Sequence, residues 1–180
     1  MAEGEPVTTS ARYVVPSASG AGDAWAAEAA AGGRRGTQTI LRAGEVAASG
    51  RVADLLGVER GAPVVERQRI MYLDGEPCEL THTYYPLEIA RGTALAAAAK
   101  IRGGAVRLLA ELGHVGARAR EDVAARLPTE SERRSLSLDA GEPVLELARL
   151  TLAAGGRPIQ ADVMVMTSRG QGLRYEIKIG

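Results

Sequence analysis

The feature that most constrains the fold is an internal repeat within the 180 residues of the chain. GAPVVERQRI at 61–70 aligns without gaps with GEPVLELARL at 141–150, an offset of 80 residues. DGEPCELTHTYYP then aligns with GGRPIQADVMVMT after one added residue. A colinear match of this length predicts two copies of one supersecondary unit, related by a pseudo-twofold axis.

Each copy is expected to contain a strand, a short helix and a β-hairpin. The hairpin signal is strong because β-rich runs flank tight-turn residues, Asp74-Gly75 in the first copy and Gly155-Gly156 in the second. The predicted strands are 37–48, 63–73, 77–85, 117–127, 144–152, 158–166 and 173–179. The predicted helices are 23–31, 52–56, 105–112 and 130–136. The fold class is therefore α+β, with a mostly antiparallel sheet of about six strands and flanking helices.

Composition excludes several classes of protein. Lys and Arg number 22 and Asp and Glu number 22, so the chain lacks the surplus cations that phosphate neutralisation requires. A single cysteine, Cys78, excludes an internal disulfide and a cysteine-cluster metal site. No apolar run approaches the ~20 residues of a membrane span, and no signal peptide opens the chain. We expect a cytoplasmic protein with no membrane partner, no metal and no cofactor.

Two arginines point to an anion-binding strand. Arg67 and Arg69 are two residues apart in a predicted strand, so their side chains share one face. Adjacent guanidinium groups in a sheet need an anionic ligand or carboxylates. The alternative is a solvent-exposed arginine face, which fits a chain with 20 Arg and two Lys.

The hairpin partners of this strand supply further candidates. Thr81, Thr83 and Tyr85 share a face of one strand, and Asp162, Met164 and Met166 hold similar places in the second hairpin. A buried Asp162 needs a partner, either an arginine or a ligand donor, whereas the methionines could equally fill the core.

A glycine pair, Gly103-Gly104, precedes the predicted helix 105–112 and would let a ligand approach the backbone, or form an ordinary loop. No P-loop, nucleophile-elbow, zinc-protease or dinucleotide motif occurs in the sequence, so we expect no enzyme.

Several stretches resemble the UTRA domain, the effector-binding domain of HutC-type regulators in the GntR family. They are VERQRIMYLDGEPCELTHTYYP, GGAVRLLAELG, GEPVLELARLTLAAGGRPIQADVMVM and the closing LRYEIKI. The resemblance covers about residues 20–180, and residues 1–19 are expected to form an arm or linker. It implies a chorismate-lyase-like fold, a ligand pocket, a homodimer, and DNA contact only through a winged helix-turn-helix domain that this chain lacks.

The resemblance also implies an effector site, although many family residues are replaced. The family's Arg-x-Arg falls on Arg69 and Met71, a strand glutamate on Thr81, and a helix-opening serine near Gly104. Its late Glu and Tyr fall on Gln160 and Met166, and its early Ser-Phe lies near Trp25. The predicted effector-binding residues are Arg69, Arg67, Met71, Thr81, Thr83, Gly103, Gly104, Gln160, Asp162, Met164, Met166 and Trp25. These replacements favour a less charged, more apolar effector than a phosphosugar.

Two rival functions make different predictions. A chorismate-lyase-like enzyme needs an acid beside its arginine anchor, and Asp162 is the best-placed acid because Glu76 and Glu79 lie beside a turn. A dimerisation module without ligand predicts a collapsed pocket filled by Met71, Met164 and Met166. For the homodimer, the terminal strand 173–179 is the first candidate interface and residues 37–48 the second.

Overall fold

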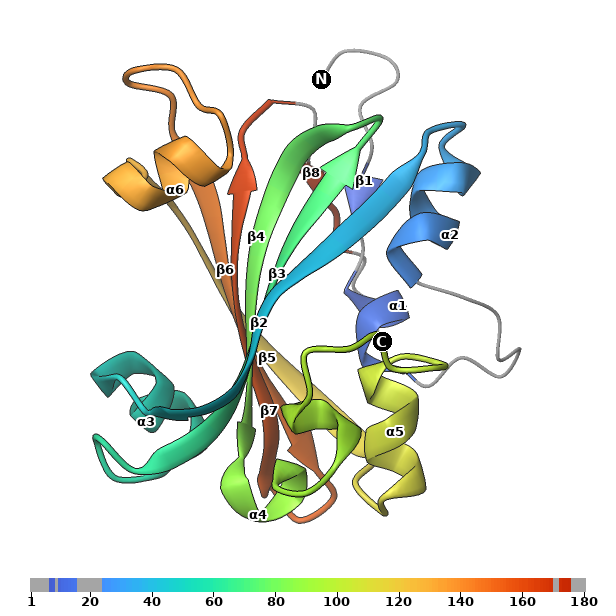
Figure 1. Cartoon of the computed structure of the whole chain (residues 1–180), viewed down its shortest axis with the longest axis vertical. Coiled ribbons are helices and arrows are strands. Elements are labelled where there is room, and N and C mark those ends of the chain that lie inside the picture. Colours follow the sequence, from blue (N-terminus) through green and yellow to red (C-terminus); the bar gives the residue numbers. More distant parts are fainter. Residues whose placement is uncertain (1–6, 9, 16–23, 170–171, 176–180) are drawn as a thin grey trace, which may run out of the picture.

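The fold is a six-stranded antiparallel sheet with helices on both faces (Figure 1). The computed structural model describes residues 7–8, 10–15, 24–169 and 172–175. The elements in chain order are β1 (Val7–Thr8), α1 (Ala11–Val14), α2 (Ala24–Ala31), β2 (Gly36–Ala47), α3 (Gly50–Leu56), β3 (Pro63–Leu73), β4 (Glu76–Pro86), α4 (Leu87–Ala90), the 3-10 helix η1 (Ala94–Ala96), α5 (Ala105–Glu111), β5 (Gly116–Arg126), α6 (Glu130–Ser135), β6 (Val144–Ala153), β7 (Pro158–Thr167) and β8 (Gly172–Leu173). The fold class predicted from the sequence is confirmed.

The strand order β2-β3-β4-β7-β6-β5 reflects the repeat, since the second copy follows the first in reverse order across the sheet. His82 of β4 lies directly opposite Val163 of β7, and these two residues are equivalent in the repeat alignment. The pseudo-twofold axis therefore crosses the sheet at this pair, where β4 and β7 run antiparallel.

The repeat is longer than the sequence alignment indicates, because a helix precedes the first strand of each copy. At the end of α2 the Arg34 amide donates to the Ala29 carbonyl, and at the end of α5 the His114 amide donates to the Leu109 carbonyl. The donor and the acceptor of the second bond each lie 80 residues after those of the first. Each copy is therefore helix, strand, helix and hairpin: α2-β2-α3-β3-β4 and α5-β5-α6-β6-β7.

Turn chemistry explains why the two hairpins form where the sequence predicts. Asp74 and Gly75 have φ of +55° and +91°, as a two-residue type I′ turn requires, and Asp and Gly tolerate that region. Gly155 and Gly156 both have φ of +85°. The predicted hairpin strands match β3, β4, β6 and β7 to within one residue at each end.

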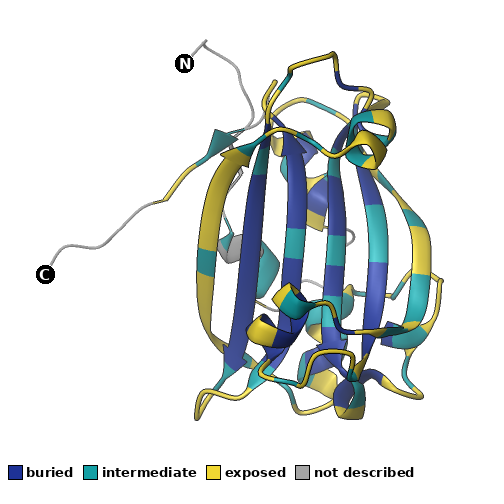
Figure 2. Cartoon of the chain, turned by 90° about the vertical axis from the view of Figure 1, so that its left-hand side faces the viewer, coloured by how far each residue is buried: buried dark blue, intermediate teal, exposed yellow. Residues whose placement is uncertain are grey.

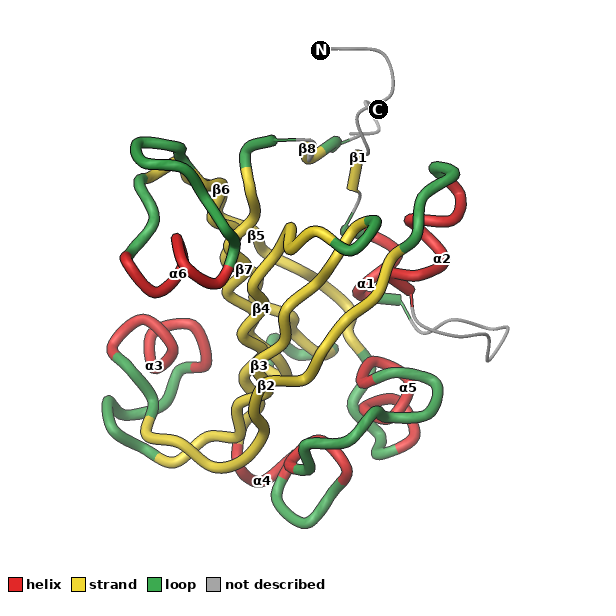
Figure 3. The backbone as a smooth tube through the Cα atoms, turned by 45° about the horizontal axis from the view of Figure 1, so that its top comes forward, coloured by secondary structure: helices red, strands yellow, loops and turns green. Residues whose placement is uncertain are grey.

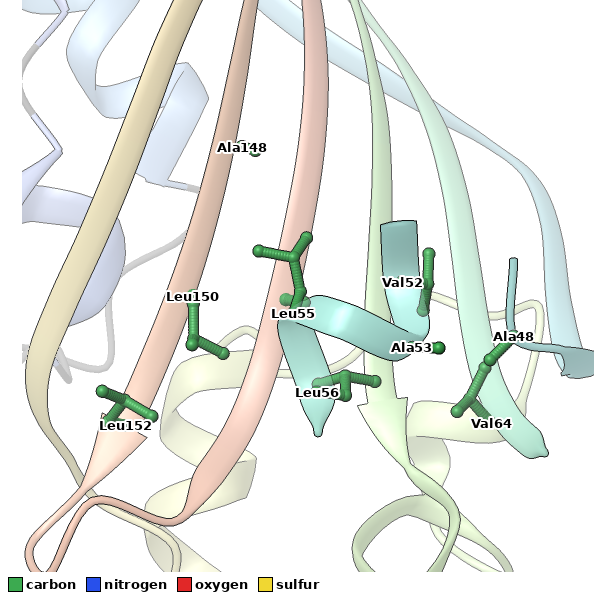
Figure 4. Packing of buried hydrophobic residues seen from close by; sticks show 10 residues of the cluster. Ala48, Val52, Ala53, Leu55, Leu56, Val64, Ala148, Leu150 and Leu152 are labelled. Atoms are coloured by element: carbon green, nitrogen blue, oxygen red, sulfur yellow. The ribbon is translucent and has the colours of Figure 1, made fainter. Parts of the chain in front are cut away.

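One face of the sheet, the α3–α6 face, is closed by the second helix of each copy (Figure 2). Val52, Leu55 and Leu56 of α3 pack on Ala148 and Leu150 of β6 (Figure 4). Below α6, the buried residues are Leu80, Leu136, Leu138, Val144 and Val165. This burial supplies a large part of the core stabilisation.

The opposite face, the α2–α5 face, carries the first helix of each copy together with α1 and the loop that contains α4 and η1 (Figure 1). β1 and β8 pair in parallel as a separate two-stranded sheet at one end of the molecule (Figure 3). Among the described residues, no helix is long and apolar enough to cross a membrane.

The two ends of the chain contain short elements that the sequence analysis did not predict. The expected arm at 1–19 contains β1 and α1, and of the expected strand 173–179 only Leu173 lies in a described strand, β8. Arg174 and Tyr175, which follow it, are exposed. Asp23, predicted to cap α2, and residues 176–180 lie outside the described residues.

Candidate functional site

A line of polar side chains crosses the middle of the α2–α5 face. The strand register places Arg69 of β3 opposite Thr81 of β4, and Thr83 of β4 opposite Asp162 of β7. Asp162 in turn lies opposite Arg149 of β6. Since directly opposed residues point to the same side of a sheet, four neighbouring strands bring these five side chains to one face.

Asp162 lies at the centre of this line and is only 3% exposed. Its Oδ1 accepts a hydrogen bond from Thr83 Oγ1 at 2.8 Å, and its Oδ2 accepts one from Gln160 Nε2 at 2.8 Å. The partner that a buried Asp162 was predicted to need is therefore a pair of neutral donors. Thr83 and Gln160, both predicted site residues, are thereby brought together with Asp162.

Arg69 is held more loosely. Its Nη1 donates to Gln38 Oε1 at 3.4 Å and its Nη2 donates to Thr83 Oγ1 at 3.3 Å, both at the long end of the hydrogen-bond range. The Nε atom is buried and makes no hydrogen bond within the described part of the chain. A buried N–H without an acceptor costs about 1–3 kcal/mol, so this position is suited to an acceptor supplied by a ligand.

Glu79 is a site residue that sequence reasoning missed. It was placed beside the turn, but its carboxylate accepts a hydrogen bond from Thr81 Oγ1 on the α2–α5 face. Burial raises the pKa of the Glu79 carboxyl, although that hydrogen bond and the charge of Arg69 oppose the rise. Strand alternation places Glu79 on the same face as Thr81 and Thr83, and this spacing would have predicted Glu79 as a site residue.

Arg149 is the second residue that was missed. It is 4% exposed, and its Nε donates to Glu121 Oε1 at 2.5 Å while its Nη2 donates to Ser10 Oγ at 2.9 Å. Burial acts to raise the pKa of Glu121, but hydrogen bonds from Ser10 and Arg149 outweigh it and hold that pKa below its usual value. The repeat alignment pairs Arg149 with Arg69, and this equivalence would have predicted Arg149 on the same face of the sheet.

Arg67 has a different role from the one predicted. Its guanidinium donates to the carbonyl oxygens of Ala94, Leu95, Ala97 and Ala99, with Nη2 to Ala99 O at 2.9 Å. All of these acceptors belong to the loop around η1. Arg67 therefore fixes this loop on the sheet, and both of its terminal nitrogens already have backbone acceptors.

The predicted apolar site residues lie in two core clusters beside the polar line. Trp25 and Met71 pack together below α2, and the indole Nε1 donates to the Tyr72 carbonyl at 3.0 Å. Met164 and Met166 pack with Leu147. These four residues are therefore part of the core next to the polar line.

Gly103 and Gly104 form the turn before α5, with φ of +82° and +85°. A left-handed backbone of this kind favours glycine, which accounts for both residues without a ligand. The hydrogen bonds of the polar line run through other residues.

Helix α1 closes the α2–α5 face over the second copy. The enclosed cavity beside it is about 10 Å³, room for one water molecule at most. Its lining residues are Tyr13, Val14, Val106, Leu109, Val115, Gly116, Thr151, Ile159 and Gln160. Thr151 Oγ1 is buried and has no hydrogen-bond partner among the described residues. The site therefore has little free space, and two of its buried polar atoms, Arg69 Nε and Thr151 Oγ1, have no hydrogen-bond partner in the described part of the chain.

The described part of the chain contains no group of three or more His, Cys, Asp or Glu side chains that could hold a metal ion. His82, on the opposite face, has its Nδ1 2.9 Å from Glu66 Oε1. Cys78 is buried, and its thiol donates to the Met71 carbonyl at 3.5 Å.

Known proteins resemble this chain over most of its length. Residues 31–169 match the UTRA domain family. An uncharacterised HTH-type transcriptional regulator of Streptomyces coelicolor is 32% identical over 146 residues, which are 79% of this chain and 53% of the relative. The chain therefore spans about half the length of the curated relative that it matches.

Solved structures show the same fold. The effector domain of PhnF from Mycobacterium smegmatis superposes with a TM-score of 0.73 at 21% identity, covering 86% of this chain and 94% of that domain. A candidate GntR-family transcriptional regulator superposes with a TM-score of 0.78 at 24% identity, covering 99% of this chain and 72% of that one.

Proposed function

The chain belongs to the UTRA domain family, and we propose that it binds a small-molecule effector for a bacterial GntR-type transcriptional regulator of the HutC subfamily. The observation that carries this proposal is the buried Nε–H of Arg69, which has no acceptor within the described residues. A residue kept for stability alone would be expected to have all its buried donors paired.

The surroundings of Arg69 suggest the chemistry of the effector. The guanidinium offers a charged donor to a carboxylate or another strong acceptor. Beside it, Glu79 and Asp162 can accept hydrogen bonds from a hydroxyl or an amine. The buried side chains of Met164 and Met166 add apolar surface on the neighbouring strand β7. An effector with one acceptor group and a largely apolar body fits these walls better than a phosphosugar does.

Binding would act on transcription through a second domain. The effector must prefer one of two domain arrangements for its binding free energy to change operator affinity. We propose that DNA contact is made by a winged helix-turn-helix domain and not by the residues of this chain. A gel shift with the 180-residue chain and its operator at physiological salt is expected to show no specific complex.

The test is differential scanning fluorimetry against amino acids, sugars, nucleosides and antibiotic-like compounds. A ligand that binds only the folded state raises the melting temperature by mass action. Arg69→Ala is expected to weaken binding of any such compound by about 1.5–3 kcal/mol, since a charged hydrogen bond is lost. The proposal is contradicted if no compound raises the melting temperature, or if Arg69→Ala binds the compounds as tightly as the unchanged chain does.

A dimerisation module without ligand is a second candidate, because the water-sized cavity and the buried methionines are what it predicts. The unpaired atoms of Arg69 and Thr151 argue against it, since a module without ligand gains nothing from them. An enzyme is the weaker rival, because the relative and the solved structures above are transcriptional regulators or their domains. Incubation with chorismate, followed by chromatography, is expected to give no product.

We also propose a homodimer with an interface of at least ~1,000 Å² in total. β2 and β5 are the two edge strands of the large sheet, and β5 is the more exposed, with Val123 at 46%. The described start of the terminal segment, our first expectation, pairs with β1 outside the large sheet. Within the large sheet, β2, which contains most of our second candidate 37–48, and β5 are the candidates. Light scattering at tens of micromolar is expected to return twice the monomer mass.

A further inference from the structure

The two copies of the repeat fill the space between their first helix and the sheet in different ways. Below α2, the space holds the side chains of Trp25 and Met71. The repeat offset of 80 residues makes Ala105 and Thr151 their equivalents below α5. An indole and a thioether are thus replaced by a methyl group and a small hydroxyl, which leaves a gap in the second copy.

Two equivalent glycines show what occupies this gap. A Cβ placed on Gly36 of β2 would lie 2.9 Å from Trp25 Nε1. A Cβ on Gly116, the matching residue of β5, would lie 2.9 Å from Thr151 Cγ2 and 3.6 Å from the backbone oxygen of Val14. In the second copy Thr151 therefore lies closest to this glycine position, and the backbone of α1 lies at ordinary van der Waals distance from it, where the first copy has Trp25.

Helix α1 belongs to neither copy. Tyr13 and Val14 line the small cavity with Thr151, and both are only partly buried. Next to the helix, Ser10 Oγ accepts from Arg149 Nη2. Tyr13 Oη donates to Glu28 of α2. A four-residue helix is not stable by itself, so contacts with the rest of the molecule must hold it in place.

We propose that residues 10–15 form an intramolecular plug, which occupies the part of the effector site formed by the second copy and which the effector displaces. This inference rests on the proposed function. The plug covers Thr151 Oγ1 and uses one donor of Arg149, so its departure opens a space lined by Thr151 and Ile159 of the sheet and by Leu109 of α5, with Arg149 two residues along β6 from Thr151.

The proposal identifies the chemistry of the ligand group that enters. The space now holds a phenol ring and a valine side chain, so a ring-sized apolar group with a hydroxyl or carbonyl fits it. In the proposed regulator the DNA-binding domain precedes this segment, so release of the plug would alter the connection between the two domains.

The first experiment tests whether a binding cavity lies below the plug. In the full chain, Tyr13→Ala removes the phenol ring, and p-cresol is added as a probe that restores it. We expect a saturable rise of the melting temperature by several degrees for Tyr13→Ala. Val15→Ala, a matched control on an exposed residue of the same segment, should show none. Absence of a rise in Tyr13→Ala, with folding verified by circular dichroism, overturns the proposal.

The second experiment tests whether the plug can be released without any ligand. Ala105→Trp with Thr151→Met rebuilds below α5 the filling found below α2. Thiol labelling of Val14→Cys should then accelerate about tenfold, since local opening sets the rate for a covered thiol. Val15→Cys should react at one rate in both backgrounds. An unchanged rate for Val14→Cys overturns the plug, whereas the metabolite library tests the effector proposal separately.

Discussion

The two copies of the repeat have the same backbone plan and different chemistry. Glu66 of β3 and Glu146 of β6 are equivalent, and both are buried carboxylates in ion pairs on the α3–α6 face. On the α2–α5 face, by contrast, Arg149 has a carboxylate partner in Glu121 while Arg69 has an unpaired Nε–H. Symmetry is kept where it supports the fold, and it is broken where a ligand is proposed to bind.

The same difference appears in the packing of the first helices. Below α2, Trp25 and Met71 of the first copy fill the space, whereas below α5 a segment from outside the repeat contributes to the filling. A core residue cannot leave without unfolding its surroundings, but an added segment can. The comparison therefore separates the part of the sheet that supports the fold from the part that can open.

The largest expected effect comes from removing the internal filling of the first copy. Trp25→Ala is expected to lower the free energy of unfolding by about 3–5 kcal/mol, since it leaves a cavity in a packed cluster. Tyr13→Ala should lower the free energy of unfolding by clearly less, because the Tyr13 side chain is only partly buried. Urea denaturation of the two variants measures the difference. Equal losses of unfolding free energy in the two variants would contradict the distinction between a core residue and a plug residue.

The next comparison uses the two equivalent arginines. Arg149→Met leaves the largely buried carboxylate of Glu121 without its charged partner and is expected to lower the free energy of unfolding by about 3 kcal/mol. Arg69→Met removes an unpaired donor together with two long hydrogen bonds, so we expect a change within ~1 kcal/mol. The measurement is again urea denaturation at neutral pH. A large loss for Arg69→Met would make this residue structural and weaken the effector site.

The smallest effect concerns α3 and α6, which are equivalent helices held in place differently. Four residues of α3 are buried and none of α6 is, but α6 begins with a capping box between Thr129 and Glu132. A hydrogen bond from Arg126 lowers the pKa of Glu132 from its usual 4.5 to about 2. Because the folded-state pKa is lowered, this stabilisation is complete above pH 4.5 and is lost as the pH falls towards 2.

Glu132→Gln is therefore expected to cost roughly 1 kcal/mol at neutral pH, and progressively less from pH 4.5 down to pH 2. The matched change Val52→Ala in α3, at the equivalent position, should cost the same at every pH. Denaturation series at several pH values test this. A loss for Glu132→Gln that stays constant down to pH 2 would contradict the argument.

The sequence was sufficient to predict most of the fold. The hairpin strands, the Asp74-Gly75 turn and the capping box of α6 depend on local chemistry, and local patterns reveal them. Of the predicted terminal strand 173–179, only Leu173 lies in a described strand, and residues 176–179 lie outside the described residues. Alternation predicts a strand only when one face is buried, and Tyr175, on the predicted apolar face, is exposed.

The site was harder to predict because it depends on packing between distant segments. Arg67 was expected beside a ligand, but loop carbonyls that no local pattern reveals take its donors. Glu79 and Arg149 could have been found from strand alternation and from the repeat alignment. The plug could not, since nothing in residues 10–15 indicates which gap they fill until Trp25 is compared with Ala105 in three dimensions.

The most direct test of the central claim is NMR observation of the arginine Nε–H groups, with Arg149 as internal reference for Arg69. Acetate, inorganic phosphate and benzoate serve as probes of an acceptor binding in the α2–α5 face. We predict a saturable shift of the Arg69 Nε–H resonance with at least one of them, while Arg149, whose Nε already donates to Glu121, stays unchanged. Two results would contradict an effector site at Arg69. Either the Arg69 resonance does not shift with any of the three probes up to tens of millimolar, or it shifts only together with the Arg149 resonance.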